Sequence, residues 1–165
     1  MSKHVVEIKE NSVKIVFDKE ISEKLNVPDI DFSTCDLVQL DMREFSFINS
    51  LGIQKWVQWS NPIKENIRVE MTGVHYSFLQ FESLMMGFLP EGLEIHSIVL
   101  PYFCDSCENE SDHSYDIYLL DKSNKNEKDL MAKLSEAPCS HCAEVAELDT
   151  RPKDVANILL RFWPA

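Results

Sequence analysis

The sequence lacks long apolar runs, and it holds few glycines, few prolines and few basic residues. No segment approaches the roughly 20 apolar residues of a membrane-spanning helix, and the start MSKHVVEIKENS has no apolar signal region. We therefore expect a cytoplasmic protein with no membrane partner. Only 4 Gly and 7 Pro occur in 165 residues, which excludes a low-complexity chain. Against 28 Asp and Glu stand 16 Lys and Arg, and the net charge of −12 excludes a basic nucleic-acid binder.

Enzyme signatures are also missing. The sequence contains no G-x-G-x-x-G loop, no P-loop, no G-x-S-x-G elbow and no H-E-x-x-H motif. His4, His75 and His96 have no sequence neighbours that suggest a catalytic triad or a ligand set, so we expect structural or surface roles for them. Because no nucleophile and base can be paired, we expect a non-catalytic protein. Its hydrophobic content of 44% is enough to bury a core.

Apolar patterns through residue 100 predict an α/β fold. Alternating and continuous apolar stretches indicate five strands, at residues 4–8, 12–17, 37–42, 67–72 and 93–100. Helical spacing predicts one helix at 51–60 and a second after Gly73. The second helix has these residues on one face: Phe78, Phe81, Leu84 and Met85. The order β-β-β-α-β-α-β predicts a mixed β-sheet with helices on one side.

From residue 101 onward the pattern changes to that of a smaller α+β unit. Two cysteine pairs bracket the expected elements, a strand at 115–120 and a helix at 129–134. Pro152 suits the first turn of a terminal helix, with Asp149 or Thr150 as its cap. The apolar stripe of that helix consists of Val155, Ile158, Leu159 and Phe162. We therefore expect two domains, at residues 1–100 and 101–165.

Residues 37–53 read LVQLDMREFSFINSLGI and resemble the corresponding segment of STAS domains. In that family a central strand ends in Asp, a short loop follows, and an Asp-Ser-x-Gly segment opens the next helix. Asn49-Ser50-Leu51-Gly52 stands at that place here. The resemblance covers roughly residues 4–100 and implies a STAS-like mixed sheet for them.

The resemblance also implies a function for Ser50. In STAS anti-sigma factor antagonists a partner serine kinase phosphorylates the serine after the Asp, and the added charge switches binding to that partner. Ser50 inherits this place, with Asn49 and Gly52 beside it in the switch loop. Asn49 replaces the acidic residue of the family and keeps a cap-forming side chain without the charge.

A physical argument for Ser50 stands beside the resemblance. A hydroxyl at a helix N-terminus has free backbone N–H groups next to it, and these would also stabilise a phosphate. The alternative is that Asn49 or Ser50 only caps the helix. Four large side chains offer candidate contact surface for a partner, although Trp and Met at helical spacing more often lie in the core: Trp56, Trp59, Met85 and Met86.

The pairs Cys104-x-x-Cys107 and Cys139-x-x-Cys142 carry the strongest chemical signal. A two-residue spacer lets a tight turn present two thiolates to one tetrahedral ion, so we expect a structural Zn²⁺ with four cysteine ligands, as in zinc-ribbon-like modules. Such a closed site leaves no position for a catalytic water. Its expected task is to fold a segment too small for its own core.

Other interpretations of these cysteines stay open at this point. His113 or His141 could replace one cysteine ligand, and the two pairs could be redox-active dithiols. Cys35 stands alone and is expected to be a small buried hydrophobe.

Together these patterns predict a cytoplasmic signalling phosphoprotein that binds partner proteins. The expected partner is an anti-sigma-type serine kinase acting on Ser50, and the oligomeric state stays undetermined. One alternative is a fixed adaptor without a phosphorylation switch. The other is a redox or zinc sensor in which oxidation of the cysteine pairs releases the metal.

Overall fold

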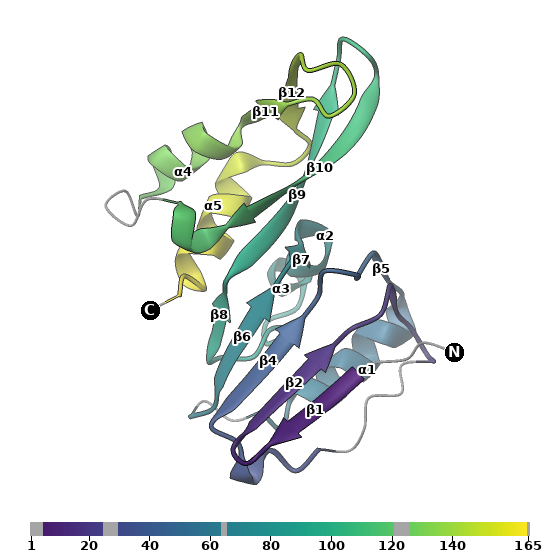
Figure 1. The fold of residues 1–165 in the computed structure, drawn as a ribbon, viewed down its shortest axis with the longest axis vertical. Helices are drawn as coiled ribbons and strands as arrows, with labels where there is room; N and C mark the ends of the chain where they lie inside the picture. The colour runs from purple at the N-terminus through teal and green to yellow at the C-terminus, as the bar shows by residue number, and fades with distance from the viewer. Residues whose placement is uncertain (1–4, 25–29, 64–65, 121–125, 165) are drawn as a thin grey trace.

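The computed structural model describes residues 5–24, 30–63, 66–120 and 126–164 and shows a mixed α/β protein with two lobes (Figure 1). The first lobe is built on a five-stranded sheet of order β1-β2-β4-β6-β8. Its strands are β1 (Val5–Lys9), β2 (Ser12–Val16), β4 (Leu37–Asp41), β6 (Arg68–Thr72) and β8 (Leu93–Ile95). β1 and β2 form an antiparallel hairpin, and the other neighbours pair in parallel. The mixed sheet and the predicted hairpin are therefore confirmed.

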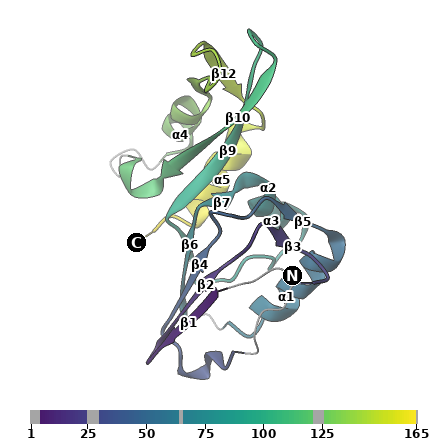
Figure 2. The ribbon, with the colours of Figure 1, turned by 45° about the vertical axis from the view of Figure 1, so that its right-hand side comes forward.

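One face of this sheet is apolar and covered, and the other is polar and open. The inward residues are buried, and they are Val13, Ile15, Val38, Leu40, Val69, Met71, Leu93 and Ile95. Alternate residues on the same strands carry polar groups to the opposite face, as period-two strands require. Figure 2 shows α1 and α3 on one side of the sheet only.

The covering helices are α1 (Ser50–Ser60), α2 (Tyr76–Leu79) and α3 (Phe81–Leu84). Trp56 of α1 is fully buried, and its indole Nε1 donates to the carbonyl of Phe88 at 2.7 Å. Its ring makes edge contacts with those of Phe17 and Phe78, at centroid distances of 5.7 and 4.9 Å. These aromatic contacts fix α1 against the sheet.

The second predicted helix is wrong in extent, because α2 and α3 are two short pieces and the chain leaves helical geometry at Met85. Phe78 is buried as expected, but Leu84 and Met85 are exposed. The physical reason lies in Glu82, whose buried carboxylate accepts the backbone N–H of Leu89 at 2.8 Å and folds the chain back.

A two-stranded parallel sheet that the sequence pattern did not predict joins β3 (Glu20–Ile21) to β5 (Phe47–Ile48). It lies beside the start of α1 (Figure 2). The backbone N–H of Asn49 donates to the carbonyl of Ile21 at 3.2 Å, which continues this contact into the helix cap.

The second lobe contains a sheet of order β10-β9-β12-β11, with β7 pairing in parallel to β9. Its strands are β7 (Val74–His75), β9 (Ser97–Cys104), β10 (Asn109–Asp116), β11 (Glu136–Pro138) and β12 (Val145–Leu148). The helices that follow in the chain are α4 (Glu127–Leu134) and α5 (Pro152–Arg161). Of the two 3-10 turns, Ile117–Leu119 follows β10, and Phe32–Thr34 comes just before β4 of the first sheet. Figure 1 shows α4 and α5 side by side next to this sheet.

The strand predicted at 93–100 is wrong, because two strands of different sheets occupy this range. β8 ends at Ile95, β9 begins at Ser97, and His96 lies between them. Residue 100, where we expected a domain boundary, falls inside β9. The buried positions change from odd to even numbers across His96, which is the mark of a bend between two sheets.

Among the later elements, both predicted helices are present and the predicted strand is misplaced. The strand predicted at 115–120 is wrong in position, because β10 ends at Asp116 and a 3-10 turn follows it. The predicted helices at 129–134 and after Pro152 are confirmed as α4 and α5. All four residues of the terminal stripe are buried. The predicted cap is wrong, because Arg151 precedes α5 and makes no side-chain cap bond.

In the part of the chain that the structure describes, none of the helices has the length and apolar character needed to cross a membrane.

Candidate functional site

The four paired cysteines come together at the far end of the second lobe. Cys104 ends β9 and Cys107 lies in the turn to β10, while Cys139 follows β11 and Cys142 lies in the turn before β12. Both turns lie at the end of the lobe away from α1 (Figure 1). The four sulfur atoms all lie within 4.8 Å of one another. The two sequence-distant pairs therefore form one cluster, as their spacing predicts.

The two turns share the same backbone geometry. The N–H of Glu108 donates to the carbonyl of Cys104 at 2.8 Å, and the N–H of Ala143 donates to that of Cys139 at 3.0 Å. Glu108 and Ala143 each follow the second cysteine of a pair, and they have φ angles of 55° and 64°. In the described residues no other side-chain-bearing position has a positive φ. Each turn thus bends sharply enough to aim two thiols at one point.

Backbone N–H groups also favour the ionised form of one ligand. Hydrogen bonds from the N–H groups of His141 and Cys142 lower the pKa of the Cys139 thiol to about 6. The N–H of His141 lies 3.4 Å from the Cys139 sulfur. A thiolate is the form that binds metal ions, so the turn prepares this cysteine for coordination.

The sulfur spacing fits a metal and not a disulfide. Cys104 Sγ and Cys142 Sγ are 3.6 Å apart, and so are Cys107 Sγ and Cys139 Sγ. A disulfide needs about 2.05 Å. A tetrahedral ion with bonds of about 2.3 Å to sulfur places its ligands about 3.8 Å apart. The cluster could therefore bind a metal ion with four sulfur ligands.

The two histidines considered as replacement ligands lie outside this cluster. The ring of His113 packs on that of Tyr102 at a centroid distance of 5.1 Å, and its Nε2 lies 3.4 Å from the hydroxyl of Ser111. His141 is exposed and contributes its backbone N–H. Cys35 is buried in the core of the first lobe, as expected.

Ser50 is the first residue of α1 and is exposed. Asn49 caps the helix, because its Oδ1 accepts the N–H of Gly52 at 2.7 Å. The Asn49 Nδ2 donates to a carboxylate oxygen of Glu23 at 2.8 Å, and this bond lowers the pKa of Glu23. The capping role predicted as an alternative is therefore present for Asn49, and it leaves the Ser50 hydroxyl at the surface.

Gly52 holds α1 unusually close to the neighbouring chain. A Cβ at this position would lie 2.0 Å from the carbonyl oxygen of Ile21 and 2.6 Å from its carbon. Only a residue without a side chain fits there. The glycine of the sequence motif is thus required by packing against β3.

Two large apolar side chains close to Ser50 in the chain are exposed. Phe47 of β5 is 55% exposed and Leu51 of α1 is 52% exposed. Trp56 is buried and Trp59 is partly buried against the core, which excludes Trp56 as a contact residue. Met86 is almost fully exposed. The sequence pattern did not single out Phe47 or Leu51.

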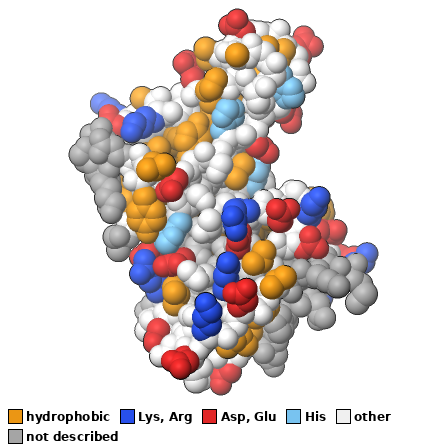
Figure 3. All heavy atoms as spheres, in the orientation of Figure 1, with side chains coloured by type: hydrophobic (Ala, Val, Ile, Leu, Met, Phe, Trp, Pro, Cys, Tyr) orange, Lys and Arg blue, Asp and Glu red, His pale blue; other side chains and the backbone are white. Residues whose placement is uncertain are grey.

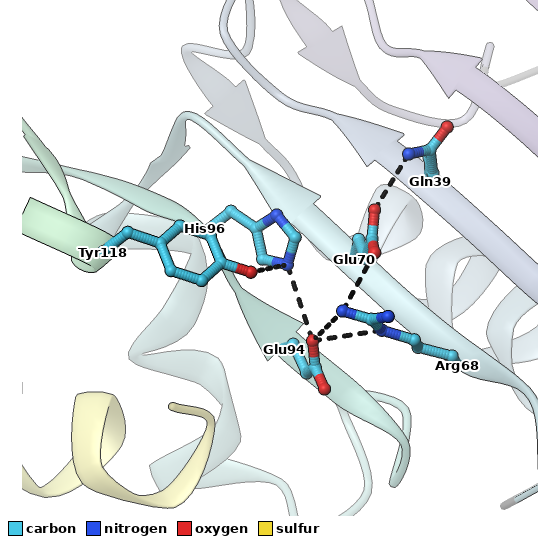
Figure 4. A network of polar contacts seen from close by, with 6 residues as sticks. All are labelled: Gln39, Arg68, Glu70, Glu94, His96 and Tyr118. Atoms are coloured by element: carbon cyan, nitrogen blue, oxygen red, sulfur yellow. Dashed lines mark hydrogen bonds and ion pairs between the residues drawn. The ribbon is translucent and has the colours of Figure 1, made fainter. Parts of the chain in front are cut away.

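Sequence reasoning also missed a second polar cluster, formed by Glu70, Glu94 and His96 (Figure 4). We expected only a structural or surface role for His96. The sequence signal that could have found this cluster is the alternation of apolar and polar residues in β6 and β8, whose outward positions hold the two glutamates.

Comparison with models of known protein families, with curated proteins and with solved structures found no match.

Proposed function

We propose that the chain is a non-catalytic signalling protein that binds a partner protein through the surface around Ser50. The observation that carries the proposal is the exposure of Phe47 and Leu51 beside this serine. Large apolar side chains gathered at one place on a charged surface are typical of a protein contact. Phosphorylation of Ser50 would bring a double negative charge into that contact and weaken it.

The arrangement of the first lobe supports a STAS-like interpretation. β4 is the central strand and ends at Asp41, the segment through β5 follows, and Asn49 opens α1. This is the order that the resemblance implies for a strand, a switch loop and a helix. In STAS-like signalling the serine at that place takes a phosphate from a partner kinase, which makes Ser50 the candidate residue.

We further propose that the metal in the second lobe is a structural zinc ion. Four thiols at tetrahedral spacing suit Zn²⁺, and four protein ligands leave no open position for chemistry. Cys104 and Cys107 belong to the β9–β10 hairpin, while Cys139 and Cys142 belong to the β11–β12 hairpin. The ion would therefore cross-link two hairpins that also pair with each other through β9 and β12.

Partner capture from the source cells tests the role of Ser50. The bait is the full chain, compared with its Ser50→Asp and Ser50→Ala variants and with Phe47→Glu. Ser114→Asp is the matched control, because Ser114 is an exposed serine on β10 in the other lobe. We expect one protein to bind the natural chain, Ser50→Ala and Ser114→Asp, and to be lost with Ser50→Asp and Phe47→Glu. Equal capture by all five baits would refute the proposal.

A fixed adaptor is the second candidate, and the cap bond from Gly52 to Asn49 favours it. An asparagine committed to capping does not need to activate the serine hydroxyl. In this case Ser50→Asp retains the captured protein while Phe47→Glu loses it. The same set of variants thus separates the switch from the adaptor.

A redox sensor is the third candidate, favoured by the exposure of Cys142. An exposed thiolate ligand is open to oxidation, after which paired cysteines would release the ion. Mild peroxide should then release zinc and form disulfides between ligand cysteines. Unchanged zinc content and thiol count after peroxide would exclude this role.

A further inference from the structure

We infer that Glu70, Glu94 and His96 form a second cation site, for a divalent transition-metal ion, on the open face of the first sheet. The carboxylate and imidazole atoms of these residues lie within 4.8 Å of one another. Figure 4 shows the carboxylates of Glu70 and Glu94 on either side of the Arg68 guanidinium, with the His96 ring beside Glu94. This site does not depend on the cysteine centre, and it goes beyond the proposed function.

Strand register sets the positions of the three side chains. Glu70 on β6 and Glu94 on β8 are direct partners across the parallel pair. His96 follows Glu94 by two residues, and two residues are one period of an extended chain, so both side chains point to the same face. The N–H of His96 donates to the carbonyl of Met71 at 2.8 Å, which ties its backbone to β6. The donors therefore stand on rigid backbone.

The two carboxylates of this cluster lie close together and bind the same positive group. The two glutamate side chains are only 14% and 16% exposed, and like charges directly opposite each other destabilise a sheet. Arg68 lies between them, with its Nη2 3.2 Å from Glu70 Oε1 and 2.8 Å from Glu94 Oε2. The two carboxylates thus share one guanidinium, and His96 Nε2 lies 3.6 Å from Glu94 Oε2. Figure 3 shows both signs of charge across this face of the lobe.

Arg68 marks the place where positive charge is stabilised, and its Nε and Nη2 both donate to Glu94 Oε2, at 3.2 and 2.8 Å. Its side chain is 51% exposed, and the guanidinium is carried at the end of a long, flexible side chain. A divalent ion would bring twice the charge to the same carboxylates. We expect Arg68 to swing into solvent when the ion binds.

The donor set points to a transition-metal ion. Glu94 Oε2 and His96 Nε2 are 3.6 Å apart, close to the spacing of about 3.4 Å that a tetrahedral ion with bonds of about 2.1 Å requires. Gln39 Nε2 donates to Glu70 Oε2 at 2.8 Å, which orients this carboxylate so that Oε1 faces the site. An imidazole beside two carboxylates favours Zn²⁺ and Co²⁺ over Mg²⁺ and Ca²⁺. Three protein ligands leave a position open, unlike the closed cysteine centre.

Cobalt titration tests the site on the full chain, after the cysteine centre has been loaded with one equivalent of zinc. We expect one equivalent of Co²⁺ to bind with visible d–d absorption and without the near-ultraviolet thiolate charge-transfer bands that cobalt on cysteines gives. Arg68→Gln should bind Co²⁺ several-fold more tightly, because the competing guanidinium is gone. Glu94→Gln and His96→Ala should each lose this equivalent.

Arg43→Gln is the matched control, because Arg43 also pairs with a carboxylate, that of Asp41. It should leave cobalt affinity unchanged. A gain of affinity in Arg68→Gln cannot arise from misfolding, so it supports the site even where a loss variant is unstable. Two results would overturn the inference: no oxygen- and nitrogen-ligated cobalt in either the natural chain or Arg68→Gln, or undiminished binding in a folded Glu94→Gln. The cluster would then be an ion-pair network only.

Discussion

Gly52 is the residue on which the placement of helix α1 depends most directly. A methyl group at this position would lie 2.0 Å from the carbonyl oxygen of Ile21, which is backbone and cannot rotate away. We predict that Gly52→Ala lowers the free energy of unfolding by roughly 1–3 kcal/mol, because either α1 or β3 must move. Urea denaturation followed by circular dichroism measures the change.

Leu51→Ala is the control for this prediction. Leu51 is the preceding helical residue and is exposed, so its replacement should change stability by about 0.5 kcal/mol or less. Equal stability of Gly52→Ala and the natural chain would show that the close approach of α1 and β3 is not required.

Asp41 is a nearly buried carboxylate whose main cationic partner is Arg43. Hydrogen bonds from the side chain of Arg43 lower the pKa of Asp41 below its usual value of 3.8, and the Arg43 backbone N–H contributes further. A lowered folded-state pKa means that the stabilisation is present above the unfolded pKa and is lost as the pH falls through the folded pKa.

We predict that Asp41→Asn is less stable than the natural chain at pH 7 and that the difference shrinks as the pH falls below about 4. Thermal unfolding of both proteins between pH 7 and pH 3 measures this. A difference that stays constant over the whole range would show that the ion pair does not contribute to stability.

At the scale of elements, the turn after each cysteine pair carries backbone strain. Ala143 has a φ of 64°, a region in which residues with a Cβ are disfavoured. We predict that Ala143→Gly stabilises the metal-loaded chain by about 0.5–1 kcal/mol. Ser140→Gly, in the same turn at negative φ, should destabilise it instead. If both variants shift the unfolding midpoint in the same direction, the strain interpretation fails.

Elements with a regular apolar period could be predicted from the sequence, and elements set by tertiary contacts could not. The alternation of Val13 and Ile15 and the stripe of Val155 and Leu159 gave β2 and α5. The break between α2 and α3 depends on Glu82 bonding to a distant N–H, which no local pattern encodes. β3 and β5 are two residues each, too short for any period to appear.

The candidate sites divide in the same way. The cysteine cluster could be predicted because two-residue spacing fixes the geometry of each turn, and only the meeting of the two turns needed the fold. The cluster of Glu70, Glu94 and His96 could not, because its members are brought together by the register of β6 and β8. The exposure of Phe47 beside Ser50 depends on the pairing of β5 with β3, which the sequence did not indicate.

At the scale of the whole molecule, α5 joins the two lobes. The carbonyl of Phe162, just after α5, accepts the N–H of Ile95 at the end of β8 at 2.8 Å. Arg161 Nη1 lies 2.8 Å from a carboxylate oxygen of Glu82, whose side chain is only 3% exposed. A buried carboxylate loses most of its compensation when its cation is removed.

We predict that Arg161→Ala lowers the free energy of unfolding by roughly 1–3 kcal/mol. Arg151→Ala should change it by about 0.5 kcal/mol or less, because Arg151 is exposed and pairs only with Asp154 of its own helix. Chemical denaturation of both variants measures the difference. Similar behaviour of the two would mean that the pair between Arg161 and Glu82 does not hold the lobes together.

The most direct measurement counts zinc released as the cysteines react. Protein purified without added metal is passed over a chelating resin and treated with a thiol-modifying reagent under native conditions, while a colorimetric chelator reports free zinc. We predict close to one zinc per chain, released in step with the modification of Cys104, Cys107, Cys139 and Cys142, and no tightly bound zinc in Cys139→Ser. Absence of metal in folded protein, or zinc retained after all four thiols have reacted, would contradict a structural four-cysteine zinc centre.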